Sequence, residues 1–391
     1  MTLQDHAPTQ SAIGSGSDTQ RRYRRIVVKA GTSLLTGGTD RLDLEMLATL
    51  VGQIARLQSR GCQIMLVSSG AVSAGQHVLR KKSTSHGLPM RQVLAAVGQT
   101  RLMNAYEQLF DWHDIAVAQA LLSRRDLSDR LGYLNIRNTL LGLLEHEAVP
   151  IINENDVVSV DELSGEVFGD NDTLSAMVAN IVDADLLVML GEVGGLYTAD
   201  PHLDPDAKLI PSVDRLSDDI ESMGGPSWQD QGRGGMATKL DAARLATASG
   251  VDAVIANGRI SNAIVRLTEG ESLGTFFPAT STRLESRKRW MLSQASDNGA
   301  IVVDEGAVHA LVSHNRSLLP PGIIEARGSF GRGDIVTIVK ADNEQIACGI
   351  SNYSCKDISS ISRMQSDQIA EILGHHFGDE VVHRNNMVVL S

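Results

Sequence analysis

The stretch Arg25-Ile-Val-Val-Lys-Ala-Gly-Thr-Ser33 joins a short apolar run to a lysine and a glycine turn. Such a run is typical of a buried strand in a parallel sheet. Apolar residues then recur at helical spacing over 44–55, Gly61 marks the end of that helix, and 63–67 is a second apolar run. The order strand, helix, strand predicts a right-handed βαβ unit with the lysine at the end of its first strand.

The same alternation continues along most of the chain. We expect further strands at 115–120, 149–152, 185–190 and 252–256, and helices near 92–110, 134–146, 173–182 and 236–249. This order predicts an α/β fold, with an open, mostly parallel sheet sandwiched by helices.

The C-terminal part of the chain has a different pattern. Its apolar segments are short, β-branched and closely spaced, which predicts a small β-rich domain with one or two helices. These segments are 301–303, 322–326, 334–339, 345–350 and 387–390. We therefore expect a disordered leader over 1–22, a large domain over 23–280, a linker over 281–297 and the β-rich domain over 298–391.

The composition limits the classes of function. A chain of 391 residues suits two domains, and its net charge of −12 argues against general attraction to nucleic acid or acidic membranes. Its three cysteines match neither a zinc motif nor a disulfide framework, which favours reduced thiols. No apolar run approaches the roughly 20 residues that span a bilayer, and the leader lacks the apolar core of a signal peptide. We therefore expect a cytoplasmic protein.

Two lysines lie beside glycine turns where parallel sheets bind ligands. Lys29 precedes Gly31, whose turn could present backbone N–H groups to phosphate, although a lysine at a strand end can also be simply solvated. Residues 232–239 read Gly-Arg-Gly-Gly-Met-Ala-Thr-Lys, with Lys239 one turn into a helix. Their spacing departs from the Walker motif, which favours a nucleotide site of another kind.

Polar side chains follow other predicted strands. Ser69 lies in a Ser-Ser-Gly-Ala segment that could hold a carboxylate or phosphate, or could simply cap the next helix. Residues 153–156, Asn-Glu-Asn-Asp, could bind a substrate ammonium group or form an Asx-rich turn. Residues 169–172, Gly-Asp-Asn-Asp, precede a helix, so one aspartate could cap it while the other holds cations in position.

The histidine pair His375 and His376 could suggest a metal site. Adjacent side chains project apart, and the sequence offers no suitably spaced third ligand. We therefore expect no metal site formed by the protein alone.

Seven segments, in order, resemble the amino acid kinase family, and the C-terminal part looks like a PUA domain. The kinase segments are Val28-Lys-Ala-Gly-Thr-Ser33, Val67-Ser-Ser-Gly-Ala71, Leu94-Ala-Ala-Val-Gly-Gln99, Ile152-Asn-Glu-Asn-Asp156, Gly169-Asp-Asn-Asp172, Gly195-Leu-Tyr-Thr-Ala-Asp-Pro201 and Gly234-Gly-Met-Ala-Thr-Lys239. The PUA-like segments are Val303-Asp-Glu-Gly306, Ser317-Leu-Leu-Pro320 and Gly374-His-His376.

The resemblance implies ATP-dependent phosphorylation of the side-chain carboxylate of L-glutamate, the first step of proline biosynthesis, with ATP and Mg²⁺ as cofactors. By position it assigns Lys29 and Lys239 to the transferring phosphoryl group and Asp172 to holding both lysines. The residues it assigns to L-glutamate are Ser69, Asp156 and Asn171. Those it assigns to the nucleotide are Lys29, Gly31, Gly191, Glu192, Arg233, Gly234, Gly235, Met236, Ala237, Thr238 and Lys239. Residues 191–192 and 233 depart from the Thr-Asp and Thr that are common in the family.

The resemblance also implies feedback inhibition by L-proline and assembly as a homodimer or homotetramer. Within the family, kinases of N-acetylglutamate or of aspartate are the alternatives. From a different class, the PUA-like part could belong to an RNA-binding protein. Residues 296–391 carry more Asp and Glu than Lys and Arg, which argues against RNA binding.

Overall fold

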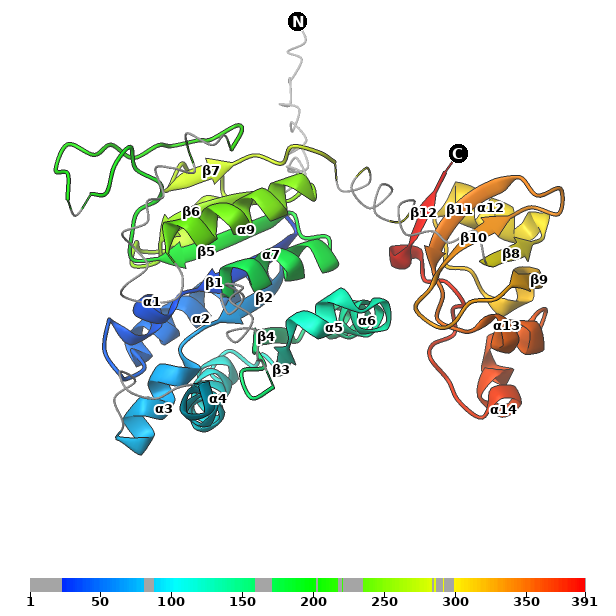
Figure 1. Ribbon diagram of the computed structural model, residues 1–391, viewed down its shortest axis with the longest axis horizontal. Coiled ribbons are helices and arrows are strands. Elements are labelled where there is room, and N and C mark those ends of the chain that lie inside the picture. The colour runs from blue at the N-terminus through cyan, green and yellow to red at the C-terminus, as the bar shows by residue number, and fades with distance from the viewer. Residues whose placement is uncertain are drawn as a thin grey trace, which may run out of the picture.

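The structure is a computed structural model, and it describes residues 23–80, 88–158, 171–201, 203–216, 235–282 and 299–390, together with 220, 285 and 291. Two separate sheets, each with its own helices, form the large and the small domain (Figure 1). The predicted α/β fold and the β-rich C-terminal part are both confirmed. The predicted leader and most of the predicted linker lie outside the described residues, so the domain boundaries remain predictions.

The large sheet has seven strands in the order β3-β4-β2-β1-β5-β6-β7. All pairs are parallel except that of β6 with the edge strand β7. In chain order the strands are β1 (Arg25–Ala30), β2 (Gln63–Ser68), β3 (Val117–Leu122), β4 (Val149–Glu154), β5 (Leu186–Gly191), β6 (Asp252–Asn257) and β7 (Thr275–Phe277). The first strand is therefore central, and the segments that follow β1, β2, β4 and β5 meet at one edge of the sheet.

Helices cover both faces because the side chains of each strand alternate. Ile26 and Val28 belong to one core cluster and Val27 to the other. The first cluster packs under α1 (Thr32–Thr36), α2 (Leu44–Ser59), α4 (Leu88–Asp111) and α10 (Ala263–Thr268). The second packs under α6 (Arg130–Glu145), α7 (Asn171–Ile181) and α9 (Met236–Ala248). The remaining helices here are α3 (Ala71–Leu79), which packs on α4, and α5 (Arg124–Ser128), which precedes α6.

The small sheet has the order β12-β11-β10-β8-β9. Its strands are β8 (Gly299–Val303), β9 (Ile323–Gly328), β10 (Ile335–Val339), β11 (Gln345–Ile350) and β12 (Met387–Val389). The helical elements are α12 (Glu305–His314), α13 (Cys355–Ile361), α14 (Ile369–Leu373) and the 3₁₀ turns η4 (Pro320–Gly322), η5 (Ser366–Gln368) and η6 (Arg384–Asn386). The prediction of one or two helices was wrong, because α13 and α14 are too short for helical periodicity to show. Across the described residues of both domains, no helix is both long and apolar enough to cross a bilayer.

The small domain is attached to the large one through α6, which faces it in Figure 1. Leu134 of α6 packs in a cluster with Ile335, Cys348 and Val388 of the small domain. Beside it, Arg137 is only 2% exposed. Its guanidinium donates to Oδ1 of Asn386 at 2.7 Å and to the carbonyl of Asn385 at 2.6 Å.

Arg137 also binds back to the large domain. It donates to the carbonyl of Ile181, the last residue of α7, and pairs with the carboxylate of Asp183 at 2.5 Å. A buried guanidinium needs such a complete set of acceptors, because an unpaired buried charge is costly. One side chain therefore fixes α6, the end of α7 and the small domain to one another.

We expect Arg137→Met to lower the free energy of unfolding by about 3–5 kcal/mol, because it removes the donor that serves a partly buried carboxylate and three carbonyl oxygens. Urea denaturation followed by circular dichroism measures this loss. The control is Arg130→Met, which removes a half-exposed ion pair with Asp334 at 3.4 Å and should cost less than about 1 kcal/mol. Equal losses in the two variants would contradict the anchoring role of Arg137.

Candidate active site

Three charged side chains meet at the carboxyl edge of the large sheet. The ammonium group of Lys29 lies 2.5 Å from Oδ1 of Asp172, and that of Lys239 lies 3.0 Å from Oδ2. All three are buried, with Asp172 fully inaccessible. Thr238 donates its hydroxyl hydrogen to Oδ2 of the same carboxylate at 3.0 Å.

Local structure explains why these residues converge. Lys29 is the penultimate residue of β1, Asp172 lies in the first turn of α7, and Lys239 lies in the first turn of α9. The backbone of two glycines lies close to the lysine side chains: a Cβ added at Gly31 would lie 3.7 Å from Nζ of Lys29, and one at Gly191 would lie 3.7 Å from Cε of Lys239, which are ordinary contact distances. Two backbone segments thus run directly along the cationic pair.

The charges of the cluster determine its ionisation. Burial by itself would raise the pKa of Asp172, but the charges and hydrogen bonds of Lys29 and Lys239 outweigh it and hold that pKa well below its usual range. The carboxylate is therefore ionised at neutral pH. Two cations around one anion leave the cluster with a net positive charge, which suits a phosphate group.

A chain of amide groups lies beside the charged cluster. Nδ2 of Asn171 donates to Oγ of Ser69 at 2.8 Å and to Oδ1 of Asn153 at 3.0 Å. Nδ2 of Asn153 donates in turn to Oε1 of Gln99 at 2.8 Å. The neighbouring Ser68 shares a hydrogen bond of 2.8 Å with the buried hydroxyl of Tyr106, and burial raises the pKa of that phenol.

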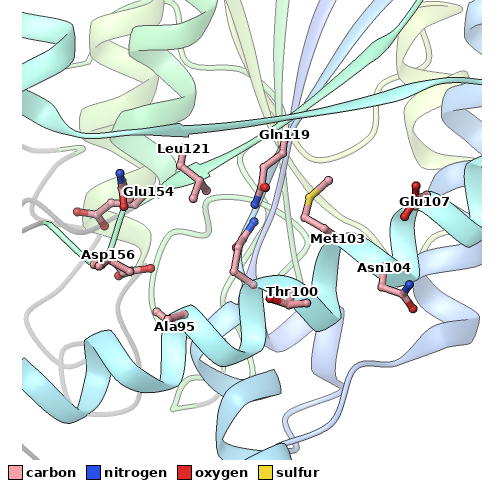
Figure 2. Close-up of a pocket in the computed structure, with 13 residues that line it drawn as sticks. Ala95, Thr100, Met103, Asn104, Glu107, Gln119, Leu121, Glu154 and Asp156 are labelled. Atoms are coloured by element: carbon pink, nitrogen blue, oxygen red, sulfur yellow. The ribbon is translucent and has the colours of Figure 1, made fainter.

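Asp156 lies at the rim of a cavity of about 510 Å³ between α4, β3 and the end of β4 (Figure 2). Gln99, Gln119 and Glu154 also line it. One oxygen of Asp156 lies 3.9 Å from Nε of Arg91 on α4. Burial lowers the pKa of Arg91, and the two acidic residues Asp156 and Glu154 oppose that shift. The cavity therefore offers amide and carboxylate groups next to the amide chain.

The structure places the residues assigned to the nucleotide unevenly. Gly235 is the N-cap of α9, Met236 is buried and Ala237 is exposed. Glu192, just beyond β5, pairs with Arg259 at 3.1 Å, and both side chains are 43% exposed. The predicted positions Arg233 and Gly234 lie outside the described residues, as do 169–170.

One backbone donor of the expected phosphate turn already has a partner in the protein. The backbone N–H of Gly31 donates to the carbonyl of Leu190 on β5 at 3.2 Å. This N–H group is therefore not available to a phosphate, because it is hydrogen-bonded to the neighbouring strand. The first helical hydrogen bond of α1 runs from the N–H of Leu35 to the carbonyl of Gly31. The backbone N–H groups of residues 32 and 33 come before this bond, so the helix itself does not engage them.

Sequence reasoning missed two polar contributors. Arg91 gave no signal, since an arginine on an amphipathic helix is ordinarily solvated. Gln99 stood within a segment quoted for the family resemblance, but nothing in the sequence linked it to Asn153, which lies 54 residues away. Thr238 was predicted as a nucleotide residue, and the structure adds a contact of its hydroxyl with Asp172 that no local pattern indicated.

Comparison with known proteins identifies the kinship of the chain. Residues 24–257 match the amino acid kinase family, and residues 299–373 match the PUA domain. The chain belongs to the amino acid kinase family.

Its relatives carry a more specific name. "Glutamate 5-kinase" from Dehalococcoides mccartyi strain CBDB1 is 50% identical over 368 residues, which are 94% of this chain and 99% of that protein. "Glutamate 5-kinase" from Herpetosiphon aurantiacus is 50% identical over 366 residues, 94% of this chain and 98% of that protein. Among solved structures, UMP kinase from Bacillus anthracis is 16% identical with a TM-score of 0.47, covering 66% of this chain and 97% of that one.

We expect Asp172→Asn to lower the free energy of unfolding by about 3–5 kcal/mol at neutral pH, because it leaves two buried ammonium groups without their anion. The pKa of Asp172 is lower in the folded than in the unfolded state, so its contribution is complete above the unfolded value of about 3.9 and is lost as the pH falls below it. The difference between wild type and variant should therefore narrow in acid.

Denaturation by urea at a series of pH values between neutral and strongly acidic measures this difference. The exposed carboxylate of Asp111 at the end of α4 supplies the control, since Asp111→Asn should leave the profile of the wild type unchanged. A gap between wild type and Asp172→Asn that persists undiminished in acid would refute the assigned charge state.

Proposed function

We propose that this chain transfers the γ-phosphoryl group of ATP to the side-chain carboxylate of L-glutamate, giving L-glutamyl 5-phosphate, the first step of proline biosynthesis. The observation that carries the proposal is the pair of ammonium groups, from opposite ends of the kinase domain, held by one buried carboxylate at the ligand-binding edge of the sheet. The names of the relatives and the length over which they match support the choice of substrate.

The chemistry requires positioning more than proton transfer. The side-chain carboxylate of glutamate has a pKa of about 4.3, so it is ionised at neutral pH and needs no general base. One of its oxygens forms a bond to the γ-phosphorus while the bond from that phosphorus to the bridging oxygen of ADP breaks, and no proton moves. The main obstacle is repulsion between two anions.

Lys29 and Lys239 address that repulsion. Fixed cations stabilise the charge of a transferring phosphoryl group without having to reorganise during the reaction. Asp172 holds both ammonium groups in place, because each of its two buried oxygens pairs with one lysine. Ser69, Asn171 and Asp156 then bind the amino acid so that its side chain reaches this cluster.

The nucleotide is proposed to lie along α9 and the end of β5, at Lys29, Gly31, Gly191, Glu192, Arg233, Gly234, Gly235, Met236, Ala237, Thr238 and Lys239. We propose that it enters as its Mg²⁺ complex. Both oxygens of Asp172 are engaged by lysines, and no group of three potential metal ligands occurs among the described residues. In this proposal Mg²⁺ would be bound through the phosphates of the nucleotide, where it would neutralise part of their charge.

We further propose a cytoplasmic enzyme that forms a homodimer or homotetramer and is inhibited by L-proline. The assembly and the inhibition by L-proline rest on the family resemblance, and the location rests on the sequence pattern. For the PUA-like domain we propose no RNA partner, because of its excess of acidic residues.

The direct test is incubation with ATP, Mg²⁺ and L-glutamate in hydroxylamine, which traps an acyl phosphate as a hydroxamate. Colour is expected with L-glutamate, and none is expected with N-acetylglutamate or L-aspartate. Colour with either of those two substrates and none with L-glutamate would overturn the proposed substrate.

We expect Lys239→Ala to lower kcat by about 100-fold or more while the KM for L-glutamate changes far less, because the lost cation acts mainly on the transition state. The hydroxamate assay at saturating substrates measures kcat. Lys340→Ala in the small domain removes a lysine that pairs with Glu344, far from the cluster, and should leave kcat unchanged. A folded Lys239→Ala enzyme with normal turnover would remove Lys239 from the mechanism.

A further inference from the structure

One backbone bond fixes the orientation of the amide groups beside the charged cluster. The N–H of Glu154 donates to Oδ1 of Asn153 at 2.9 Å. A backbone N–H is always a donor, so the atom that accepts it must be the oxygen of the amide. The other end of the Asn153 amide, its Nδ2, therefore faces Gln99 and donates to Oε1 of that residue at 2.8 Å.

The same constraint extends to Asn171. Oδ1 of Asn153 also receives Nδ2 of Asn171, and the second hydrogen of that Nδ2 goes to Oγ of Ser69. Both donor hydrogens of Asn171 are then used. Its Oδ1 is buried and has no hydrogen-bond partner among the described residues. These hydrogen bonds thus leave one polar atom of the Asn171 side chain without a partner among the described residues, and that atom, Oδ1, is an acceptor.

An acceptor without a partner can bind only a part of the substrate that donates a hydrogen bond. At neutral pH both carboxylates of L-glutamate are ionised and can only accept hydrogen bonds. The α-ammonium group is its only donor. A buried acceptor that meets no donor is costly, so Oδ1 of Asn171 matches the ammonium group and no other part of the molecule.

We propose that Gln99 is a positioning residue which, through Asn153, holds Asn171 with its Oδ1 open to the ammonium group of the amino-acid substrate and thereby sets the affinity for that substrate. This inference rests on the proposed function and deepens it. Gln99 acts at a distance, and the atom that receives the substrate belongs to Asn171.

The surroundings of Gln99 support a role beyond packing. It is only 9% exposed, yet its Nε2 has no partner among the described residues. An apolar side chain of the same size would fill this place without an unsatisfied donor. What the glutamine supplies is its Oε1, which is the acceptor for Asn153.

The backbone next to Gln99 is also fixed. At Gly98 a Cβ would lie 1.7 Å from the carbonyl oxygen of Ala71, and at Gly75 a Cβ would lie 1.9 Å from that of Leu94. These two glycines let α3 and α4 touch through their backbones. Since α3 follows directly on Ser69, the helix that carries Gln99 is held against the segment that binds Asn171.

The test compares the KM for L-glutamate with the KM for ATP in the hydroxamate assay. Gln99→Leu removes Oε1 at similar volume, and we expect it to raise the KM for L-glutamate about tenfold or more while the KM for ATP changes less than about twofold. Gln99→Glu keeps an oxygen at this position and should hold the KM for L-glutamate within about threefold of wild type. Gln108→Leu, on the exposed side of the same helix α4 and outside the residues that line the cavity, should change neither constant.

A double variant separates action through Asn171 from an independent effect. If Gln99 works as proposed, Gln99→Leu combined with Asn171→Ala has the same KM for L-glutamate as Asn171→Ala alone, within about twofold. If the two substitutions raise the KM for L-glutamate independently, so that their fold-changes multiply in the double variant, the proposal is overturned. An unchanged KM for L-glutamate in Gln99→Leu would also overturn it. Should Gln99→Leu fail to fold, Gln99→Met carries the same expectation.

The outcomes for the two proposals are distinct. A wild-type enzyme that makes no hydroxamate from L-glutamate overturns the proposed function, and this inference with it. An active wild type with a normal KM in both Gln99→Leu and Gln99→Met overturns the inference alone.

Discussion

The buried carboxylate of Asp172 is the constraint on which the site depends. Two ammonium groups that lie 210 positions apart in the sequence (Lys29 and Lys239) could not share one edge of a sheet without an anion between them. Burial makes the loss of any one of the three charges costly, because little water is available to solvate the partner that remains. The sheet order brings β1 beside β5, and α9 packs against α7, the helix that carries Asp172.

Positive charge and neutral amides divide the work of the site. The lysines face the part of the reaction where anions meet, whereas the amide chain from Gln99 to Ser69 carries no net charge and defines donors and acceptors by geometry alone. Positive charges attract any anion, whereas the fixed amides present hydrogen-bond donors and acceptors at set positions. In the proposed reaction, affinity for phosphate and selectivity for the amino acid would therefore come from different side chains.

The sequence predicted the parts of the fold that depend on local patterns of apolar and polar residues. The apolar runs of β1, β2 and β5 were evident because both faces of these strands are buried. The edge strand β3 was expected at 115–120 but spans Val117–Leu122, because its half-exposed Ala and Gln residues give no clean apolar run. The lysines and Asp172 were found from glycine turns and family resemblance, and the bonds between them depend on topology that no local pattern contains.

Long-range polar contacts explain what the sequence could not supply. Arg137 lies on a helix that was predicted, but its acceptors lie 44 residues away at Ile181 and 249 residues away at Asn386. The two ends of α7 are thereby held by different means: Asn171 and Asp172 by the site at its start, and the carbonyl of Ile181 by Arg137 at its end. A helix of eleven residues fixed at both ends cannot shift along its axis without breaking one set of bonds. The contact with the small domain is therefore part of what keeps Asp172 between its two lysines.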